Sequence, residues 1–568
     1  MQIPTTTINI ENRMRPIQEL SLRRGRAVQL AVLTMSSLCT SSVLATEFNT
    51  GDPDFKLRWD NTVKYSAAWR VNKQDTALLS SANQDDGDRN FSRGVISNRL
   101  DLLTELDASY KNFGARISGA AWLDGAYLGR NDNPGFPAAF PNQVSTSFDH
   151  FTSDTRDIHG RDGEILDAFV YGKFDLGASR ATVRAGKHSL VWGESLFFGA
   201  NGIAGGMMPV DVVKLASVPS TQFKEAIRPV SMLSGQMQVT PEVTLGAYYQ
   251  FRWQANRLPA VGSYFASVDL LQDGGEQLWV VPGAVGVPRG ADLKARNGGQ
   301  GGVQLRFRDS DTDYGLYAIR FHDKNPQLVT AVGVNAALGA IAPIGYRLAY
   351  HEGITAFGGS FSHTFGDANV AGEISFRRNQ DLASSSAAVD ASALTGAPAN
   401  DNRDKPAYAV GRTAHANLSV LWTPPRSDLF PESTLVAELA WNRALSVTKN
   451  SAVVAPKATR DAVALRMTFE PLYRQVLPGV DLSVPLGLGY SPKGSRSLAL
   501  GPGAFPAEGG GDMSVGLNAT YLSVWYAGVA YSHFYGAKRT FLDNNNNYTY
   551  QQNLKDRDFL SFSIRRTF

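Results

Sequence analysis

The stretch of the chain richest in groups that could do chemistry lies between residues 183 and 230. It begins VRAGKHSLVWGESLFF (Val183 to Phe198) and ends PVDVVKLASVPSTQFKEAIRPV (Pro209 to Val230). Charges of both signs are interleaved with Trp, Phe and Met, and such groups are costly to leave unpaired or exposed. The pattern therefore predicts a connection that folds inward against a charged wall and narrows a pore. The candidate constriction and solute-contact residues are Lys187, Trp192, Glu194, Phe197, Phe198, Asp211, Lys214, Lys224, Glu225 and Arg228.

Two roles for these residues remain open, and they are compatible. The charged groups could be structural ion pairs that hold a plug in place. Alternatively, Trp192, Phe197 and Phe198 could contact the apolar body of a solute while Lys and Arg hold its polar end. Short helical turns are expected at Val210–Leu215, after Pro209, and at Thr221–Ile227, before Pro229.

Other combinations of reactive side chains are weak. The 8 histidines show no metal-ligand spacing. Ser362 and His363 are neighbours on an expected strand and would point apart, so no catalytic triad converges there. Asp85 to Asp88 and Asp543 to Asn547 contain oxygen ligands suited to calcium, but we interpret both segments as solvated loops. We expect no catalytic residue, no metal and no cofactor.

The elements that would position this stretch are long alternating strands. Residues 55–71 place Phe, Leu, Trp, Val and Tyr on one face and Lys, Arg, Asp and Thr on the other. A strand of about 16 residues is far longer than the globular average of about five or six, and it would cross a membrane at a steep tilt. The last strand, DFLSFSIRRTF (Asp558 to Phe568), alternates in the same way. Its Phe562, Ile564 and Phe568 resemble the signal that barrel assembly machinery recognises in Gram-negative bacteria.

Long connections and short turns alternate along the chain. Short turns are expected near residues 111–114, 177, 241, 309–313, 366–367, 424–431, 478–479 and 522–524, where Gly, Pro and Asp gather. Counting gives about eighteen strands, nine long connections and eight short turns, and the even count suits a single-chain bacterial barrel. The predicted fold class is all-β, a transmembrane antiparallel β-barrel of about 18 strands with an inward-folded constriction or plug loop at about 193–229.

The amino terminus predicts export. Arg23, Arg24 and Arg26 precede an apolar run, and Val43-Leu44-Ala45 offers small-residue cleavage chemistry, so residues 1–45 are interpreted as a signal peptide and residues 46–568 as the barrel. Translation could begin at Met1 or Met14. Without this segment's five Arg and two Glu, the 55 basic and 52 acidic residues become 50 of each. A nucleic-acid partner therefore loses its support.

The run GKHSLVWGESLFF, followed by PVDVVKL, FKEAIRPV and NRLPAVGSYFASVD (Asn256 to Asp269), resembles the proteobacterial outer-membrane proteins of the family known as domain of unknown function 1302. The resemblance covers the mature chain and implies a barrel in the outer membrane, without a settled substrate or a catalytic residue. It also implies a periplasmic lipoprotein-like partner and an inner-membrane transporter, besides outer-membrane lipid. The family-like core positions are Gly186, Trp192, Gly193, Glu194, Asp211, Lys214, Lys224, Glu225 and Pro229.

The function expected from these features is an outer-membrane channel or transport protein for small organic solutes that are amphipathic or hydrophobic, such as fatty-acid-like, steroid-like or aromatic molecules. The main alternative is a general or anion- and carboxylate-selective porin. A barrel-embedded hydrolase and a structural surface protein are further alternatives from other classes. The direction of transport and the oligomeric state are not readable from the chain.

Overall fold

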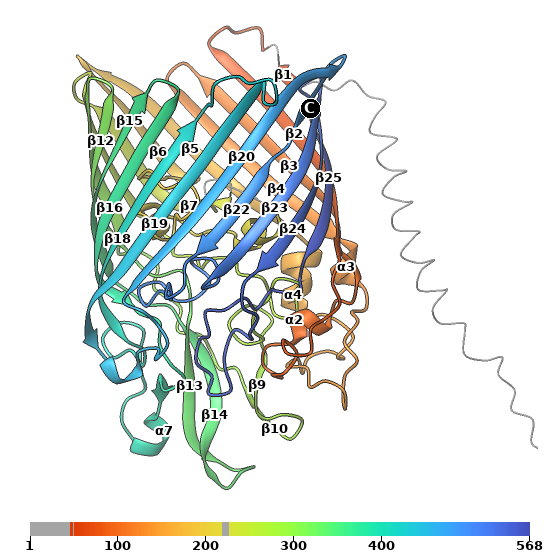
Figure 1. Ribbon diagram of the computed structural model, residues 1–568. Helices are drawn as coiled ribbons and strands as arrows, with labels where there is room; N and C mark the ends of the chain where they lie inside the picture. The colour runs from red at the N-terminus through yellow and green to blue at the C-terminus, as the bar shows by residue number, and fades with distance from the viewer. Residues whose placement is uncertain (1–45, 49, 219–225) are drawn as a thin grey trace, which may run out of the picture.

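The computed structural model describes residues 46–48, 50–218 and 226–568. Within these residues no helix is both long enough and apolar enough to span a membrane. Long antiparallel strands dominate the structure, and they wind around a cylinder with most irregular segments gathered at one end (Figure 1). The expected signal peptide, residues 1–45, lies outside the described residues.

Eighteen antiparallel strands close into the barrel. In order around the wall they are β2 (Phe55–Arg70), β3 (Gly94–Tyr110), β4 (Phe113–Asp124), β5 (Arg161–Leu176), β6 (Ser179–His188), β7 (Val230–Gln238), β8 (Val243–Gln250), β11 (Gln300–Asp309), β12 (Thr312–Phe321), β15 (Ile354–Phe365), β16 (Ala368–Asp381), β18 (Val410–Trp422), β19 (Glu432–Lys449), β20 (Asp461–Leu477), the interrupted strand β21 (Val480–Ser483) with β22 (Leu486–Ser491), β23 (Gly510–Tyr521), β24 (Trp525–Tyr535) and β25 (Phe559–Thr567).

The barrel closes where the last strand pairs with the first. β25 runs antiparallel to β2, with Thr567 opposite Thr62 and Phe559 opposite Arg70. The short strand β1 (Thr46–Phe48) pairs with the remaining end of β2. The break between β21 and β22 falls at Pro485, which has no backbone N–H to donate to the ladder. Closure leaves every barrel strand paired on both sides, as a lipid environment requires.

Smaller elements lie in the long connections, which gather at what we call the long-connection end of the barrel (Figure 1). Two hairpins and a short strand extend there. They are β9 (Gln277–Val281) with β10 (Val285–Pro288), β13 (Gln327–Asn335) with β14 (Ala340–Ala349), and β17 (Val389–Asp390). The helical turns are α2 (Asp86–Arg89), α3 (Gly125–Leu128), α4 (Ser153–Thr155), η1 (Arg156–Gly160), α5 (Ala204–Met207), α6 (Val212–Ser217), α7 (Ser392–Thr395) and η3 (Ser451–Val453).

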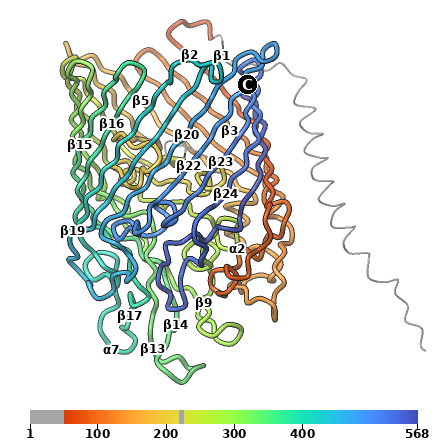
Figure 2. The backbone as a smooth tube through the Cα atoms, viewed as in Figure 1, coloured from red at the N-terminus to blue at the C-terminus, as the bar shows by residue number. Residues whose placement is uncertain are grey.

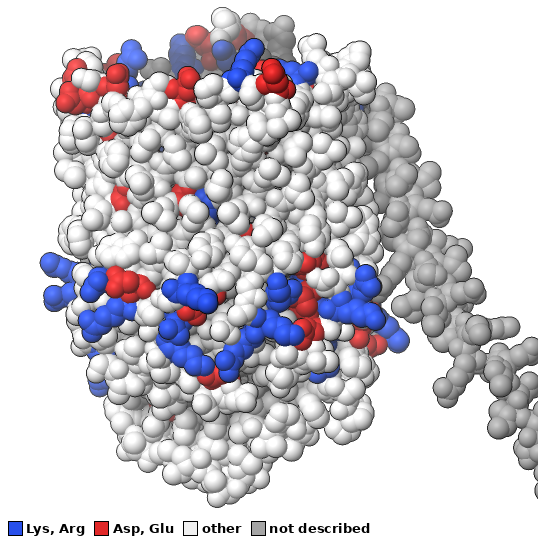
Figure 3. Space-filling model, in the orientation of Figure 1, with Lys and Arg blue, Asp and Glu red and all other residues white. Residues whose placement is uncertain are grey.

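The wall has an apolar outside and a polar inside. On the outer face of β2, Trp59 and Trp69 are 46% and 37% exposed. Lys64 lies at an alternate position and therefore points to the inner face, where it stands opposite Asp101 of β3 and Arg565 of β25. The space-filling view shows a belt with few charged side chains between two charged rims (Figure 3). This is the surface expected of a wall that meets lipid outside and water inside.

The fold class predicted from the sequence is confirmed, including the inward-folded loop. All eight expected short turns occur, because each combines residues that accept a tight reversal, such as Gly177 with φ of 69° and Gly366 with φ of 55°. The first expected strand, 55–71, is β2 with one residue less.

Candidate functional site

The third long connection, residues 189–229, leaves β6, crosses the lumen and returns to β7. In the tube view its yellow trace lies within the outline of the barrel (Figure 2). Its first half reaches β16 of the opposite wall. There the buried carboxylate of Glu373 accepts hydrogen bonds from the backbone N–H groups of Glu194, at 2.8 Å, and Ile203, at 2.5 Å.

Two further charged wall residues hold the same segment. The carboxylate of Glu438 on β19 is 1% exposed and accepts the backbone N–H groups of Phe197 and Phe198 at 2.5 and 2.8 Å. The guanidinium of Arg377 on β16 donates to the carbonyls of residues 200, 201 and 202 at 2.9 to 3.0 Å. Hydrogen bonds to charged groups are about twice as strong as neutral ones. We call residues 193–203 the crossing segment.

The approach of the crossing segment to β16 requires glycine at one position. Gly193 has a φ of 93°, and a Cβ added there would lie 2.0 Å from Oε2 of Glu373. A side chain would therefore be strained by the backbone conformation and would also displace the carboxylate that anchors the segment. This explains why a Gly stands between Trp192 and Glu194 in the motif.

Trp192, which precedes the crossing segment, and Phe198, which lies within it, are packing residues. Trp192 is 5% exposed and lies 5.0 Å from the ring of Tyr248 and 6.3 Å from the ring of Tyr317, on β8 and β12. Phe198 is also 5% exposed and packs on Phe505 at 5.3 Å. Both rings are thereby enclosed, and only the half-buried Phe197 keeps part of its ring accessible. The apolar side chains thus attach the loop to the wall.

The second half of the connection is held by a network of ion pairs on β5. Glu164 pairs with Arg257 at 2.7 Å and with Arg228 at 3.2 Å, and Arg257 also pairs with Asp211 at 2.9 Å. Asp211 in addition caps α6 by accepting the backbone N–H of Lys214 at 3.0 Å. Arg228 and Asp211 therefore have a structural role, because their ion pairs hold the part of the connection from which α6 extends.

The tip of this second half, which begins with α6, carries Lys214. Its side chain is exposed and interacts electrostatically with Lys64 on the inner face of β2, where Arg99, Asp101 and Arg565 also act on Lys64. The described tip therefore approaches the wall on the opposite side from the Glu373 anchor and brings positive charge there. Lys224 and Glu225, and most of the second expected helical turn, lie outside the described residues. The first expected turn is present as α6.

Lys187 is expected from the sequence to line the constriction, but the structure places it on the other face of the wall. It stands opposite Ala168 on β5 and Ser231 on β7, in the outward-facing phase of β6, and its Nζ donates to the carbonyl of Ile165. The sequence could not reveal this, because a one-residue change of strand phase reverses the face of every side chain.

The residues of the expected assembly signal lie in β25 and at its end. Phe562 and Ile564 stand opposite Ala67 and Tyr65 on the outward-facing phase of β2. The N–H of Phe568 donates to Asn61 at 2.8 Å, so the last residue completes the pairing of β25 with β2. Their recognition by an assembly machinery stays a prediction.

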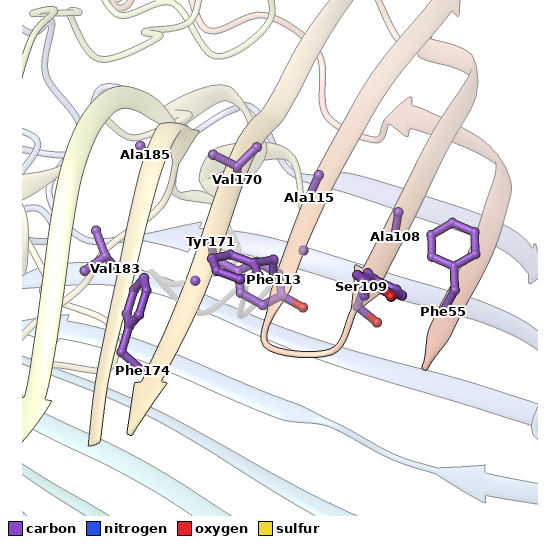
Figure 4. A pocket seen from close by; sticks show the side chains of 13 residues that line it. Phe55, Ala108, Ser109, Phe113, Ala115, Val170, Tyr171, Phe174, Val183 and Ala185 are labelled. Atoms are coloured by element: carbon purple, nitrogen blue, oxygen red, sulfur yellow. The ribbon is translucent and has the colours of Figure 1, made fainter. Parts of the chain in front are cut away.

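Two other groups of side chains lie apart from this site. An apolar groove of about 470 Å³ is lined by Phe55, Phe113, Val170 and Phe174 (Figure 4). These side chains are 36% to 58% exposed on the outer wall, so the groove faces lipid rather than the lumen. Ser362 and His363 fall on successive positions of β15 and point to opposite faces, as expected.

The acidic loop 85–88 was interpreted from the sequence as a solvated loop, and this was wrong. Asp85, Asp86 and Asp88 are at most 2% exposed, because residues of the connection 251–299 pack over them. One carboxylate oxygen each of Asp85, Asp86 and Asp269 lies within 4.8 Å of the others. Among the described residues this is the one group of His, Cys, Asp and Glu with the spacing of a metal site.

Sequence reasoning missed the wall residues that anchor the loop. Glu373, Arg377 and Glu438 are single inward positions in alternating strands, and nothing in their neighbours distinguishes them from other lumen charges. One signal could have indicated such partners. A buried loop without helix or strand leaves its backbone N–H and C=O groups unpaired, and these groups need charged or polar side chains of the wall as partners.

Among solved structures, OccAB4 of Acinetobacter baumannii is 8% identical over 93% of this chain and 100% of its own, with a TM-score of 0.40. OpdK of Pseudomonas aeruginosa, solved with vanillate, is 9% identical over 90% and 98%, with a TM-score of 0.39. The outer membrane channel DcaP of Acinetobacter baumannii is 7% identical over 93% and 100%, with a TM-score of 0.36. Nothing about the substrate of this chain follows from likeness at that level.

Among curated proteins, none matches the chain. The family described as "Protein of unknown function (DUF1302)" matches residues 26–568, which is nearly the whole sequence. The motifs GKHSLVWGESLFF and NRLPAVGSYFASVD lie within this range. The first contains the start of the crossing segment, and the second is part of the connection that packs on Asp85 to Asp88. The chain therefore belongs to the DUF1302 family.

Proposed function

We propose that the chain is an outer-membrane channel that passes amphipathic or hydrophobic organic molecules, with the connection 189–229 as its constriction. The closed barrel with an apolar outer belt supports the location, since such a wall is stable only when lipid surrounds it. The connection supports the constriction, because its crossing segment is anchored to β16 and β19 while its second half is anchored to Glu164 on β5.

The observation that carries the amphipathic class is the pairing of rings with cations on the inner wall. Arg565 lies over the ring of Tyr526 at 4.4 Å, Lys173 over Tyr171 at 5.7 Å and Arg184 over Phe169 at 5.9 Å. The register places all three rings in the inward phase of their strands. Each pair offers an apolar face beside a positive charge, which suits a solute with an apolar body and an anionic end.

A second candidate, a carboxylate-selective porin for small polar solutes, is favoured by a different observation. Among the charges that act most strongly on Lys64, three are cations, Lys214, Arg99 and Arg565, and one is the carboxylate of Asp101. An excess of positive charge in a narrow, low-dielectric passage raises the local concentration of anions. The two candidates differ in whether the apolar body of the solute matters.

Single-channel recording in planar bilayers separates them. Decanoate and benzoate should interrupt the current at lower concentrations than acetate if rings and cations act together. Equal effects of the three carboxylates on a large, steady current would instead favour the polar-solute porin and retire the amphipathic proposal.

The charge at the tip can be tested in the same experiment. We expect Lys214→Glu to shift the reversal potential toward cation selectivity without affecting assembly, because Lys214 is exposed. The matched control is Lys405→Glu, which removes an exposed lysine from the connection 382–409. Unchanged selectivity in Lys214→Glu would show that the tip does not line the passage.

A further inference from the structure

A group of buried carboxylates at the long-connection end has no role in the channel just described. Asp85 and Asp86 lie in the connection 71–93, at 2% exposure each, and Asp269 lies in the connection 251–299, at 1%. An oxygen of each lies within 4.8 Å of the others. Buried carboxylates at such distances repel one another and have lost their hydration, so something must neutralise them.

The protein neutralises other buried acids in the same region but not these. Arg70 and Arg557 face Asp88 and Asp556, with Arg70 2.9 Å from Asp556 and Arg557 4.0 Å from Asp88, so two positive charges meet two negative ones. In contrast, Arg89 pairs with Asp85, and among the described residues no ion pair reaches Asp86 or Asp269. Three carboxylates and one guanidinium leave two negative charges, which is the charge of one divalent cation.

The oxygen atoms themselves also indicate a missing partner. Oδ1 of Asp85 and Oδ1 of Asp269 are buried and have no hydrogen-bond partner. Their second oxygens are engaged, since Asp85 accepts from Arg89 and Asp269 accepts from the N–H of Asp86 at 3.3 Å. A buried oxygen left without a donor is rare in native proteins and calls for an ion or a proton.

We propose that Asp85, Asp86 and Asp269 bind one calcium ion, which ties the connections 71–93 and 251–299 together at the mouth of the barrel. Only oxygen ligands are offered, which is the preference of hard cations. A separation within 4.8 Å is no more than twice the usual Ca–O distance of about 2.4 Å, and calcium accepts several protein oxygens where magnesium tends to keep its waters.

The site also reaches a third connection. The N–H of Asn142 donates to Asp86 at 2.9 Å and the amide of Asn133 donates to Asp86 at 3.3 Å, and both asparagines belong to the connection 125–160. The proposed ion would therefore hold three connections together.

The test uses the full chain in detergent micelles, freed of metal with a chelator and titrated with calcium chloride by calorimetry. We expect one calcium ion per chain, a higher unfolding temperature with calcium than with chelator, and a weaker response to magnesium. Asp269→Asn removes one negative charge from the ligand set and should lower the affinity by about 10-fold or more. The matched control is Asp543→Asn in the connection 536–558, whose carboxylate pairs with Lys457 and should leave binding unchanged.

Two results would overturn the site. One is a wild-type chain whose unfolding temperature and heat of titration do not respond to calcium at pH 8, which would mean that protons neutralise the group. The other is equal loss of binding in Asp269→Asn and Asp543→Asn. Should Asp269→Asn fail to fold, protease cleavage within residues 71–93 of the wild type decides instead, since calcium should slow it.

Discussion

The two halves of the third long connection are held in different ways. The crossing segment is bound through its backbone to Glu373, Arg377 and Glu438, which are all buried in the wall. The described residues of the second half, 209–218 and 226–228, rest instead on Arg257 of the connection 251–299, through backbone hydrogen bonds, and on ion pairs around Glu164 of β5. Backbone anchoring fixes where the crossing segment runs whatever its side chains are. Under the proposed function, the charge at Lys214 would then set the selectivity separately from the course of the loop.

The largest effect should come from removing a backbone anchor. Glu438→Ala leaves the N–H groups of Phe197 and Phe198 buried without an acceptor. Such a loss costs about 3–5 kcal/mol, so we expect the crossing segment to detach and become a protease target. Limited proteolysis followed by mass spectrometry measures this. Protection equal to that of the wild type would mean that Glu438 is not an anchor.

A smaller effect is expected from Gly193→Ala. The new Cβ meets Glu373, and the positive φ adds strain, for a combined cost of about 1–3 kcal/mol. Thermal unfolding measures this cost. Gly366→Ala is the matched control, because its φ is 55° but nothing lies within 4 Å of the added atom. If the two variants lose the same stability, the close approach to Glu373 is not required.

The smallest effect should follow from cutting one ion pair at the base of the tip. Arg228→Gln removes the 3.2 Å pair with Glu164 but leaves the Arg257 pair, so the loss should be about 1 kcal/mol. Arg443→Gln serves for comparison, since its pair with Asp461 is 47% exposed on both sides and should contribute almost nothing. If Arg228→Gln lowered the free energy of unfolding as much as Glu438→Ala, the distinction between the two halves of the connection would not hold.

The sequence predicted the barrel because strand period, turn residues and strand length are local properties. The apolar and polar faces of β2 follow from the alternation of neighbouring residues, and the turn at Gly177 follows from the residues beside it. The inward course of residues 193–229 was also predictable, since exposed Trp, Phe and paired charges have no stable place in solvent.

The details of the site could not be predicted, because they depend on contacts across the lumen. From the sequence, Trp192 could contact a solute or pack against the protein. In the structure it packs against Tyr248 and Tyr317, which belong to strands distant in the sequence. Asp86 looked solvated because its cover, the connection that carries Asp269, lies far along the chain. The lipid-facing side of Lys187 depended on a strand phase that its neighbours did not fix.

The single-channel conductance of the double variant Glu373→Ala, Glu438→Ala tests most directly that the crossing segment narrows the passage. Both carboxylates that hold the segment on the far wall are absent in this variant. With Arg377 left as the one charged anchor named above, the segment should vacate part of the lumen, and the conductance should rise above that of the wild type. A folded double variant with the same conductance as the wild type would contradict the account.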